Sequence, residues 1–218
     1  ARKYRTGDLY IDFFNTAVQI DSASSVLYHK SKLVPGAEIM PFSVILRPLE
    51  SLALDMGGTT GTLGFQEHRT VFFDNKTKTG VAPVICYESV YGDYVTEYIR
   101  NGAGLIFIIT NDGWWEDTPG YIQHLNYARL RAIENRRQIA RSANTGVSCF
   151  VDEFGNISQA TSWWEEAVID ADLYESKELT FFSKHGDLLS YFSVGFSLVV
   201  ALLALVLRLI RRKLRTKE

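Results

Sequence analysis

The most constraining feature of this chain lies near its C-terminus, where residues 188–207 contain no charged side chain. A helix of about twenty residues spans about 30 Å, which matches the hydrocarbon thickness of a lipid bilayer. A core helix seldom lacks polar side chains on every face over such a length, so that alternative is the weaker one. We therefore predict a transmembrane helix over residues 188–210.

Charged residues are divided unevenly between the C-terminal segment and the rest of the chain. The formal net charge is −2, yet residues 187–218 carry six Lys or Arg against two carboxylates, a local charge of +4. Residues 1–186 therefore carry −6, which argues against nucleic-acid binding because that function needs basic patches. A basic cluster beside a membrane span marks its cytoplasmic side. We predict a basic cytoplasmic tail at residues 211–218 and a globular body across the membrane from the cytoplasm.

The globular body alternates patterns typical of strands and helices. β-Branched, aromatic and continuously apolar runs predict strands, while apolar residues three to four positions apart predict helices. The predicted elements are strands at 8–20, 68–75, 81–88, 105–110 and 167–173, helices at 91–100 and 120–138, a hairpin at 148–160 and a Gly- and Thr-rich loop at 53–65. This order indicates a mixed α/β fold with a layered sheet.

Cys86 stands where a buried apolar strand gives way to a helix, within the sequence VICYES. Its sulfur is expected at the sheet edge, beside the first free backbone N–H groups of that helix. Such donors stabilise a thiolate and an oxyanion forming on a substrate carbonyl. A lone strand-end cysteine is more often a small buried side chain, and Cys149, in the apolar run VSCFV, fits that description. A disulfide between the two is a further alternative in an oxidising compartment.

Three motifs, at residues 27–41, 85–89 and 110–115, come in an order and spacing that resemble the nitrilase-like carbon–nitrogen hydrolase superfamily. They read LYHKSKLVPGAEIMP, ICYES and TNDGWW. More closely, the chain resembles the bacterial apolipoprotein N-acyltransferases, a membrane branch of that superfamily. The matching signature residues are Tyr28, Lys30, Leu33, Val34, Pro35, Glu38, Cys86, Tyr87, Glu88, Asn111, Asp112, Trp114, Gln123, His124, Ala128, Arg129, Arg131, Ala132, Asn144 and Gly146. One departure is Gly36–Ala37, where the family usually has Phe-Gly before the glutamate.

The resemblance implies a fold, an activity and a location. The fold is a nitrilase-like αββα layered sandwich over residues 1–186. The activity is transfer of an acyl chain from a phospholipid donor, through a Cys86 thioester, to the N-terminal amine of a diacylated apolipoprotein acceptor. The location is the bacterial inner membrane, with a periplasmic catalytic domain and a bilayer-spanning C-terminal helix.

The resemblance also implies roles for the neighbours of Cys86. Lys30 is the family's cation beside the nucleophile, where it stabilises the thiolate and the oxyanion. Glu38 and Glu88 are its supporting carboxylates, and Tyr87 backs the nucleophile by packing or by a hydrogen bond. Without the motif, these residues would be ordinary surface charges and a packing tyrosine.

Two tryptophans follow the third motif. Trp114 and Trp115 are amphipathic side chains suited to an apolar lip for an acyl chain near a membrane. A core or loop tryptophan without a binding role is an equal alternative for each.

Enzymes of this superfamily also use a glutamate general base well upstream of the lysine. The 29 residues before Lys30 contain three aspartates and no glutamate. We therefore expect a C-terminal fragment with an incomplete catalytic triad that is inactive alone.

Other chemistries are weaker interpretations. The four histidines do not fall at metal-ligand spacing with a Cys or carboxylate pair, and residues 57–64 lack the Gly-Lys-Ser/Thr ending of a phosphate loop. We predict neither a metal nor a cofactor. The arginines within residues 129–141 are predicted on a solvated helix face, with a lipid-headgroup surface as the minor alternative. A tethered nitrilase-type amidase and a non-catalytic binding module remain as alternative functions.

Overall fold

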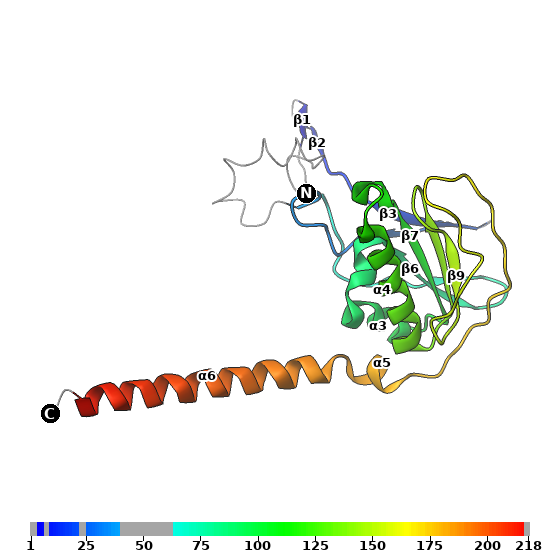
Figure 1. Cartoon of the computed structure of the whole chain (residues 1–218). Helices are drawn as coiled ribbons and strands as arrows, with labels where there is room; N and C mark the ends of the chain where they lie inside the picture. The colour runs from blue at the N-terminus through cyan, green and yellow to red at the C-terminus, as the bar shows by residue number, and fades with distance from the viewer. Residues whose placement is uncertain (1–3, 7–8, 22–24, 40–62, 216–218) are drawn as a thin grey trace. The chain divides into compact units, whose positions relative to one another are not determined.

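The computed structural model describes residues 4–6, 9–21, 25–39 and 63–215. The chain divides into two compact units, Ala1–Lys184 and His185–Glu218 (Figure 1). The elements are β1 (Tyr4–Thr6), β2 (Leu9–Ile11), β3 (Thr16–Ile20), β4 (Ser25–His29), β5 (Phe72–Phe73), β6 (Gly80–Ile85), the 3₁₀ helix η2 (Cys86–Val90), α3 (Gly92–Arg100), β7 (Leu105–Thr110), the 3₁₀ helix η3 (Asp112–Trp115), α4 (Pro119–Asn135), β8 (Ile139–Ala143), β9 (Cys149–Val151), β10 (Ile157–Ser158), α5 (Phe181–His185) and α6 (Leu188–Arg215).

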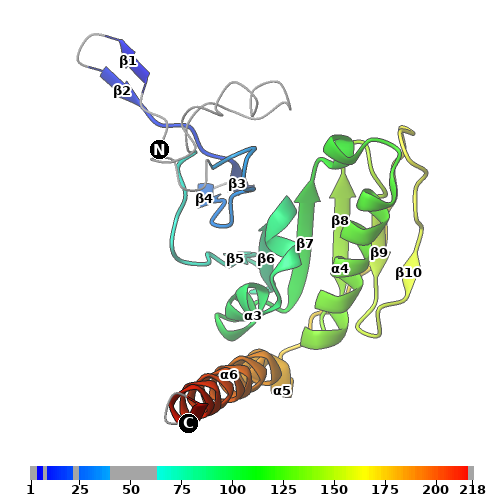
Figure 2. The same cartoon turned by 60° about the vertical axis from the view of Figure 1, so that its left-hand side comes forward.

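The first unit is built on a six-stranded mixed sheet with the order β10-β9-β8-β7-β6-β5. Strands β6, β7 and β8 are parallel neighbours, and the remaining pairs in the sheet are antiparallel. Helices α3 and α4 lie against one face of the sheet (Figure 2). The predicted α/β fold is confirmed, and the described residues also form two small antiparallel sheets, β1–β2 and β3–β4.

The core lies between the sheet and these two helices. The strands turn alternate side chains toward the helices, and small residues on α4 allow close packing. The core includes Ala82, Val84, Val95, Tyr98, Ile99, Ile106, Ile108, Leu125, Ala128, Ala132 and Ile139, all buried. The opposite face of β7 carries Phe107 and Ile109, which are 39% and 48% exposed.

Three predicted strands are shorter than expected. The segment 8–20 forms β2 and β3 with a break between them, and the segment 68–75 forms only β5. After β5 the chain turns, because Asp74 Oδ1 accepts hydrogen bonds from the backbone N–H groups of Lys76 and Thr77. The predicted strand at 81–88 ends early, at Ile85, because the helix η2 begins at the next residue.

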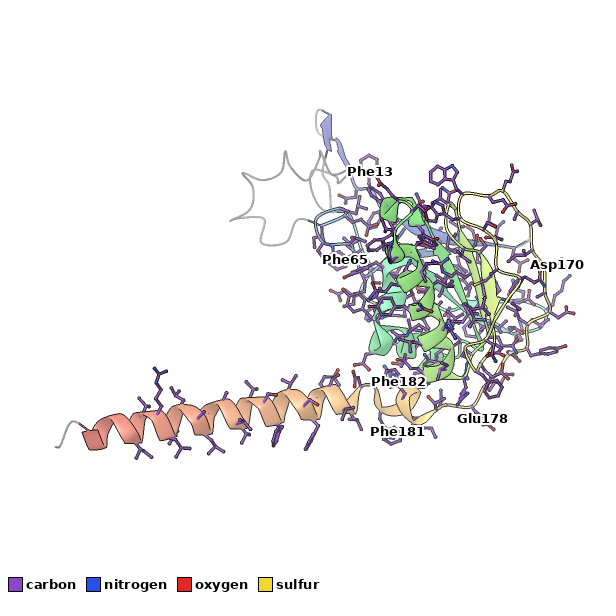
Figure 3. All side chains as sticks on the ribbon, viewed as in Figure 1. Phe13, Phe65, Asp170, Glu178, Phe181 and Phe182 are labelled. Carbon is purple, nitrogen blue, oxygen red and sulfur yellow. The ribbon has the colours of Figure 1, made fainter. Side chains whose placement is uncertain are left out.

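The strand predicted at 167–173 is wrong. This segment pairs with no strand among the residues that the structure describes, and the backbone carbonyl of Asp170 instead accepts a hydrogen bond from the side chain of Gln159. The Asp170 side chain lies at the outer edge of the unit (Figure 3). The hairpin at 148–160 is confirmed as β9 and β10, while most of the loop at 53–65 lies outside the described residues.

A strand that the sequence does not predict, β8, follows α4. Helix α4 ends at Asn135 because Arg136 adopts a left-handed conformation with φ 50°. The prediction of a solvated arginine face is wrong for Arg131, Arg137 and Arg141, which are 4%, 1% and 2% exposed. Their guanidinium groups donate to buried carbonyl and carboxylate oxygens, which offsets the cost of burying the charge.

Short helix α5 closes the first unit. Phe182 packs against the start of α3, where a β-carbon on Gly92 would lie 3.0 Å from the phenylalanine ring. The neighbouring Phe181 is 68% exposed (Figure 3). The ring of Phe182 therefore needs the absence of a side chain at position 92.

The second unit is the long helix α6. Within it, Leu188–Ile210 has a mean hydropathy of 2.4 and no buried residue, so its length and composition suit a membrane span. Asp187 precedes the helix and accepts hydrogen bonds from the backbone and the hydroxyl of Ser190, an arrangement that satisfies free N–H groups at a helix start. The predicted apolar helix is present, and its crossing of a membrane stays a prediction.

Candidate active site

A cavity of about 410 Å³ opens where the parallel strands β6 and β7 end. Its lining comes from the ends of these strands and from the β3–β4 region: Asn15, Thr16, Lys30, Glu38, Ile85, Cys86, Ile109, Thr110, Asn111 and Trp114. Four predicted site residues therefore share one cavity. The carboxyl ends of parallel strands commonly carry the binding site of an α/β protein.

Cys86 occupies a constrained turn between β6 and η2. Its φ of 49° is in the left-handed region, which costs a residue with a β-carbon roughly 1–2 kcal/mol. The hydroxyl of Ser89 donates to the Cys86 carbonyl oxygen at 2.8 Å. Because η2 begins at Cys86, the free N–H groups of its first turn lie next to the thiol. This geometry suits a nucleophile that attacks a carbonyl carbon.

Cys149 provides an internal comparison for Cys86. Both thiols are free, so the structure does not contain the alternative disulfide. Cys149 is fully buried in the core, and burial raises the pKa of its thiol to about 11, with a partly opposing effect of the Arg141 charge.

We expect iodoacetamide to label Cys86 and to spare Cys149 at pH 8. At that pH a thiol with a pKa of about 11 is about 0.1% thiolate, and the folded core also blocks access. Labelling of Cys149 should rise only above about pH 10, as its thiolate forms. Peptide mass spectrometry after timed labelling measures both rates; comparable labelling at pH 8 would contradict the burial of Cys149.

Lys30 and Glu38 form a nearly buried ion pair in the cavity. The ammonium lies 2.9 Å from Glu38 Oε1 and 2.7 Å from Oε2, with side chains 1% and 15% exposed. The backbone N–H of Val34 donates to the same carboxylate at 2.8 Å, and the Asn15 amide donates to Oε1. Glu38 therefore fixes the Lys30 ammonium inside the cavity that Cys86 lines.

Glu88 lies beneath the cavity rather than in it. The carboxylate is fully buried, and Oε1 accepts hydrogen bonds from the Tyr28 hydroxyl at 2.6 Å and from the Ser31 N–H at 2.6 Å. Oε2 accepts from the Ile85 N–H at 2.8 Å. Burial raises the pKa of Glu88, and these hydrogen bonds only partly offset that effect. Glu88 thus ties the segment after β4, which carries Lys30, to the end of β6.

Of the other predicted site residues, one lines the cavity and two pack outside it. Trp114 lines the cavity, whereas Trp115 does not; its indole ring lies against the start of α4, within 2.6 Å of a β-carbon placed on Gly120. Tyr87 is also outside the lining and packs edge-on against Tyr91, with ring centroids 5.3 Å apart. These positions favour packing for Trp115 and Tyr87.

A buried polar network lies behind the Cys86 turn, and the sequence predicts no role for it. His124 Nδ1 lies 2.9 Å from Asp112 Oδ1, and Arg141 donates to Asp112 Oδ2 at 2.6 Å. Burial alone would raise the pKa of Asp112, but the His124 hydrogen bond and the Arg141 charge together lower it. Asp112 and His124 are among the motif residues, and motif membership was the only indication in the sequence that they belong to the site. Within the described ranges no group of three metal-ligating side chains occurs.

A family model described as carbon-nitrogen hydrolase matches residues 2–177. The chain belongs to the carbon–nitrogen hydrolase family. It is 38% identical over 182 residues to an apolipoprotein N-acyltransferase of Chlorobaculum tepidum, a match that covers 83% of this chain and 34% of that protein. It is 31% identical over 188 residues to one of Haemophilus influenzae, covering 86% of this chain and 34% of that protein.

The chain thus spans about a third of the length of these two relatives. Among solved structures, an amidase from Nesterenkonia sp. AN1 in complex with butyramide superposes on 68% of this carbon–nitrogen hydrolase and on 51% of that chain. The TM-score is 0.47 and the sequence identity 16%.

Proposed function

We propose that this chain carries the nucleophile of a phospholipid-dependent acyltransferase that N-acylates bacterial lipoproteins. The observation that carries the proposal is the single cavity shared by Cys86, on its left-handed turn, and the buried Lys30–Glu38 pair. The similarity to apolipoprotein N-acyltransferases supports the choice of substrates.

The chemistry proceeds in two half-reactions. The Cys86 thiol gives its proton to a general base, and the thiolate attacks the ester carbonyl of a phospholipid to form an oxyanion. The oxyanion collapses as the ester C–O bond breaks, the base returns the proton to the leaving alkoxide, and lysophospholipid and the Cys86 thioester result. The N-terminal amine of a diacylated apolipoprotein then attacks that thioester, loses a proton and releases the Cys86 thiolate. The Lys30 ammonium and the first N–H groups of η2 stabilise both oxyanions.

The proton of the Cys86 thiol needs an acceptor. Glu38 is the one carboxylate among the described residues that line the cavity, and both its oxygens accept from Lys30. It is therefore poorly placed to act as the general base. We infer that this chain alone does not turn over phospholipid.

The long apolar helix α6 gives the proposal its location. In the proposed topology, α6 spans the bacterial inner membrane, the basic tail at residues 211–218 is cytoplasmic and the catalytic unit is periplasmic. The helix length and the charge difference across it support this orientation.

An amidase that hydrolyses a carbon–nitrogen bond is the second candidate, because the family match is to carbon–nitrogen hydrolases in general. Both candidates pass through a Cys86 thioester. They form it from different donors, an amide that releases an amine in the amidase and a phospholipid ester that releases lysophospholipid in the acyltransferase, and they also resolve it differently. Water would release the acyl group as a carboxylate in an amidase, whereas a lipoprotein amine would capture it as an amide in the acyltransferase.

An activated ester tests the proposal without a general base. The p-nitrophenolate group of p-nitrophenyl palmitate leaves without a proton, so at pH 9 the chain in detergent is expected to gain one palmitoyl group on Cys86 that hydroxylamine removes. Phospholipid vesicles should give no acyl-enzyme in the same time. Intact-protein mass spectrometry measures the product, and retention of the acyl mass in Cys86→Ala would refute the nucleophile assignment.

The second half-reaction separates the two candidates. A synthetic peptide that begins with S-diacylglyceryl cysteine is added to the isolated acyl-enzyme. Formation of N-palmitoyl peptide supports the acyltransferase, and release of palmitate alone supports the amidase.

A further inference from the structure

The proposed acyl transfer leaves a buried group behind the nucleophile without a role. His124 projects from α4, is 4% exposed, and places its two ring nitrogens against different partners. Nδ1 faces Asp112, while Nε2 lies 3.2 Å from the backbone carbonyl oxygen of Cys86 and 3.0 Å from Ser89 Oγ. The imidazole therefore bridges a buried carboxylate and the turn that carries the nucleophile.

The Asp112 side of this bridge is rigid. Asp112 is fully buried and accepts hydrogen bonds from Arg141 at 2.6 Å and from the Thr110 hydroxyl at 3.1 Å. A β-carbon on Gly146 would collide with the Asp112 side chain, so the loop after β8 packs directly on it. With its partner fixed in this way, the His124 ring has one orientation that satisfies both nitrogens.

The Cys86 side of the bridge needs support. A left-handed φ at a residue other than glycine persists only where neighbouring groups hold it, and the carbonyl of Cys86 is the group that would rotate if the turn relaxed. Ser89 Oγ donates to that carbonyl at 2.8 Å. His124 Nε2, 3.2 Å from the same oxygen, is a second donor when both ring nitrogens carry a proton, the state in which Nδ1 also donates to Asp112. Seven residues further along α4, Arg131 donates to the carbonyls of Ser89 and Val90.

We infer that His124 is a positioning residue for the nucleophile: its Nε2 holds the Cys86 carbonyl, and Asp112 with Arg141 holds the ring. This inference rests on the proposed role of Cys86. A fixed carbonyl keeps the Cys86 backbone in its left-handed conformation, which directs Sγ toward the cavity that Lys30 lines. His124 itself does not reach the cavity.

Two amide substitutions separate this role from simple core packing. Glutamine can place its Nε2 donor near the imidazole Nε2, whereas asparagine can only replace the Nδ1 donor toward Asp112. We measure the rate at which iodoacetamide alkylates Cys86 in the full chain. His124→Gln is expected to stay within about threefold of the unchanged protein, and His124→Asn to lose about tenfold or more, the effect of one lost hydrogen bond.

Controls and contrary outcomes are built into the same assay. His68→Gln changes an exposed histidine and should leave the rate unchanged, and protection of Cys149 reports that each variant is folded. Equal rates for the folded Gln and Asn variants would overturn the inference. If neither variant folds, Ser89→Ala removes the other donor to the Cys86 carbonyl; a rate loss supports anchoring of that carbonyl, and an unchanged rate overturns it.

The result is distinguishable from failure of the proposed function. If Cys86 in the protein without substitutions reacts no faster than free cysteine, the proposed role of Cys86 as an activated nucleophile is contradicted. The ratio of the Gln and Asn rates would still decide whether His124 positions the turn.

Discussion

Replacing Glu88 with alanine is expected to lower the free energy of unfolding by about 3–5 kcal/mol. The carboxylate is fully buried and accepts from the backbone N–H groups of Ser31 and Ile85 and the hydroxyls of Tyr28 and Tyr94. Alanine would leave these donors without their acceptor in a site that water does not reach. Each buried donor left without a partner costs about 1–3 kcal/mol, and relaxation recovers part of the total.

Glu88→Gln is the informative partner to this substitution. The amide keeps one oxygen for the Tyr28 side of the site, but its NH₂ group then faces the Ile85 N–H, where both groups donate. We expect a loss of about 1–3 kcal/mol. Glu97→Gln, at a partly exposed ion pair with Arg69, is the control and should cost less than about 1 kcal/mol.

Denaturant unfolding followed by tryptophan fluorescence measures these differences in detergent. All four tryptophans lie within the first unit, so the signal is independent of α6, which a micelle stabilises. A loss below about 1 kcal/mol for Glu88→Ala would show that its hydrogen bonds are replaced by water, contrary to the burial described above.

The parts of this fold that the sequence predicts are those determined by local patterns. The apolar run at 105–110 is β7 to the residue, and the predicted helices become α3 and α4 with ends shifted by at most three residues at each end. Cys86 was placed at a strand end by the same local pattern. Its left-handed φ could not be predicted, because one of the two side chains next to its carbonyl, His124, comes from the distant helix α4.

The parts that the sequence misses depend on contacts between distant segments. Arg141 is among the arginines predicted on a solvated helix face. It instead lies on β8 and pairs with Asp112, 29 residues away. Arg137 donates to the carbonyls of its neighbours Asn135 and Arg136 and also to two distant carbonyls, those of Ala103 and Glu178. Burial of a guanidinium follows from such partners, which no periodicity reveals.

The candidate active site also contains one part that the sequence predicts and another that only the structure reveals. The motif resemblance named Lys30, Glu38 and Cys86, and all three line one cavity. It also grouped Glu88 with them, but the structure places that carboxylate beneath the cavity, where it joins two strand ends. A motif identifies which residues matter to a family. Only the structure distinguishes a residue that lines the cavity from one, such as Glu88, that stabilises the surrounding fold.

Replacing Lys30 with methionine is expected to separate stability from chemistry. Methionine has a similar length and no charge, so Glu38 would keep its negative charge in a site where its side chain is only 15% exposed. Breaking a buried pair by removing one partner costs about 3–5 kcal/mol, and the partial exposure of Glu38 places our expectation at about 2–4 kcal/mol. Lys32→Met, at an exposed lysine two residues along the chain, should cost less than about 1 kcal/mol.

The double variant Lys30→Met/Glu38→Gln should recover most of the lost stability, because removing both charges also removes the cost of burying them. Its acylation by p-nitrophenyl palmitate should nevertheless remain about a hundredfold slower than that of the unchanged protein, since the cation proposed to stabilise the oxyanion is gone. Mass-spectrometric time courses of the Cys86 thioester give these rates. Acylation restored together with stability would instead mean that Lys30 serves the fold alone, and the oxyanion would then depend on the backbone N–H groups of η2.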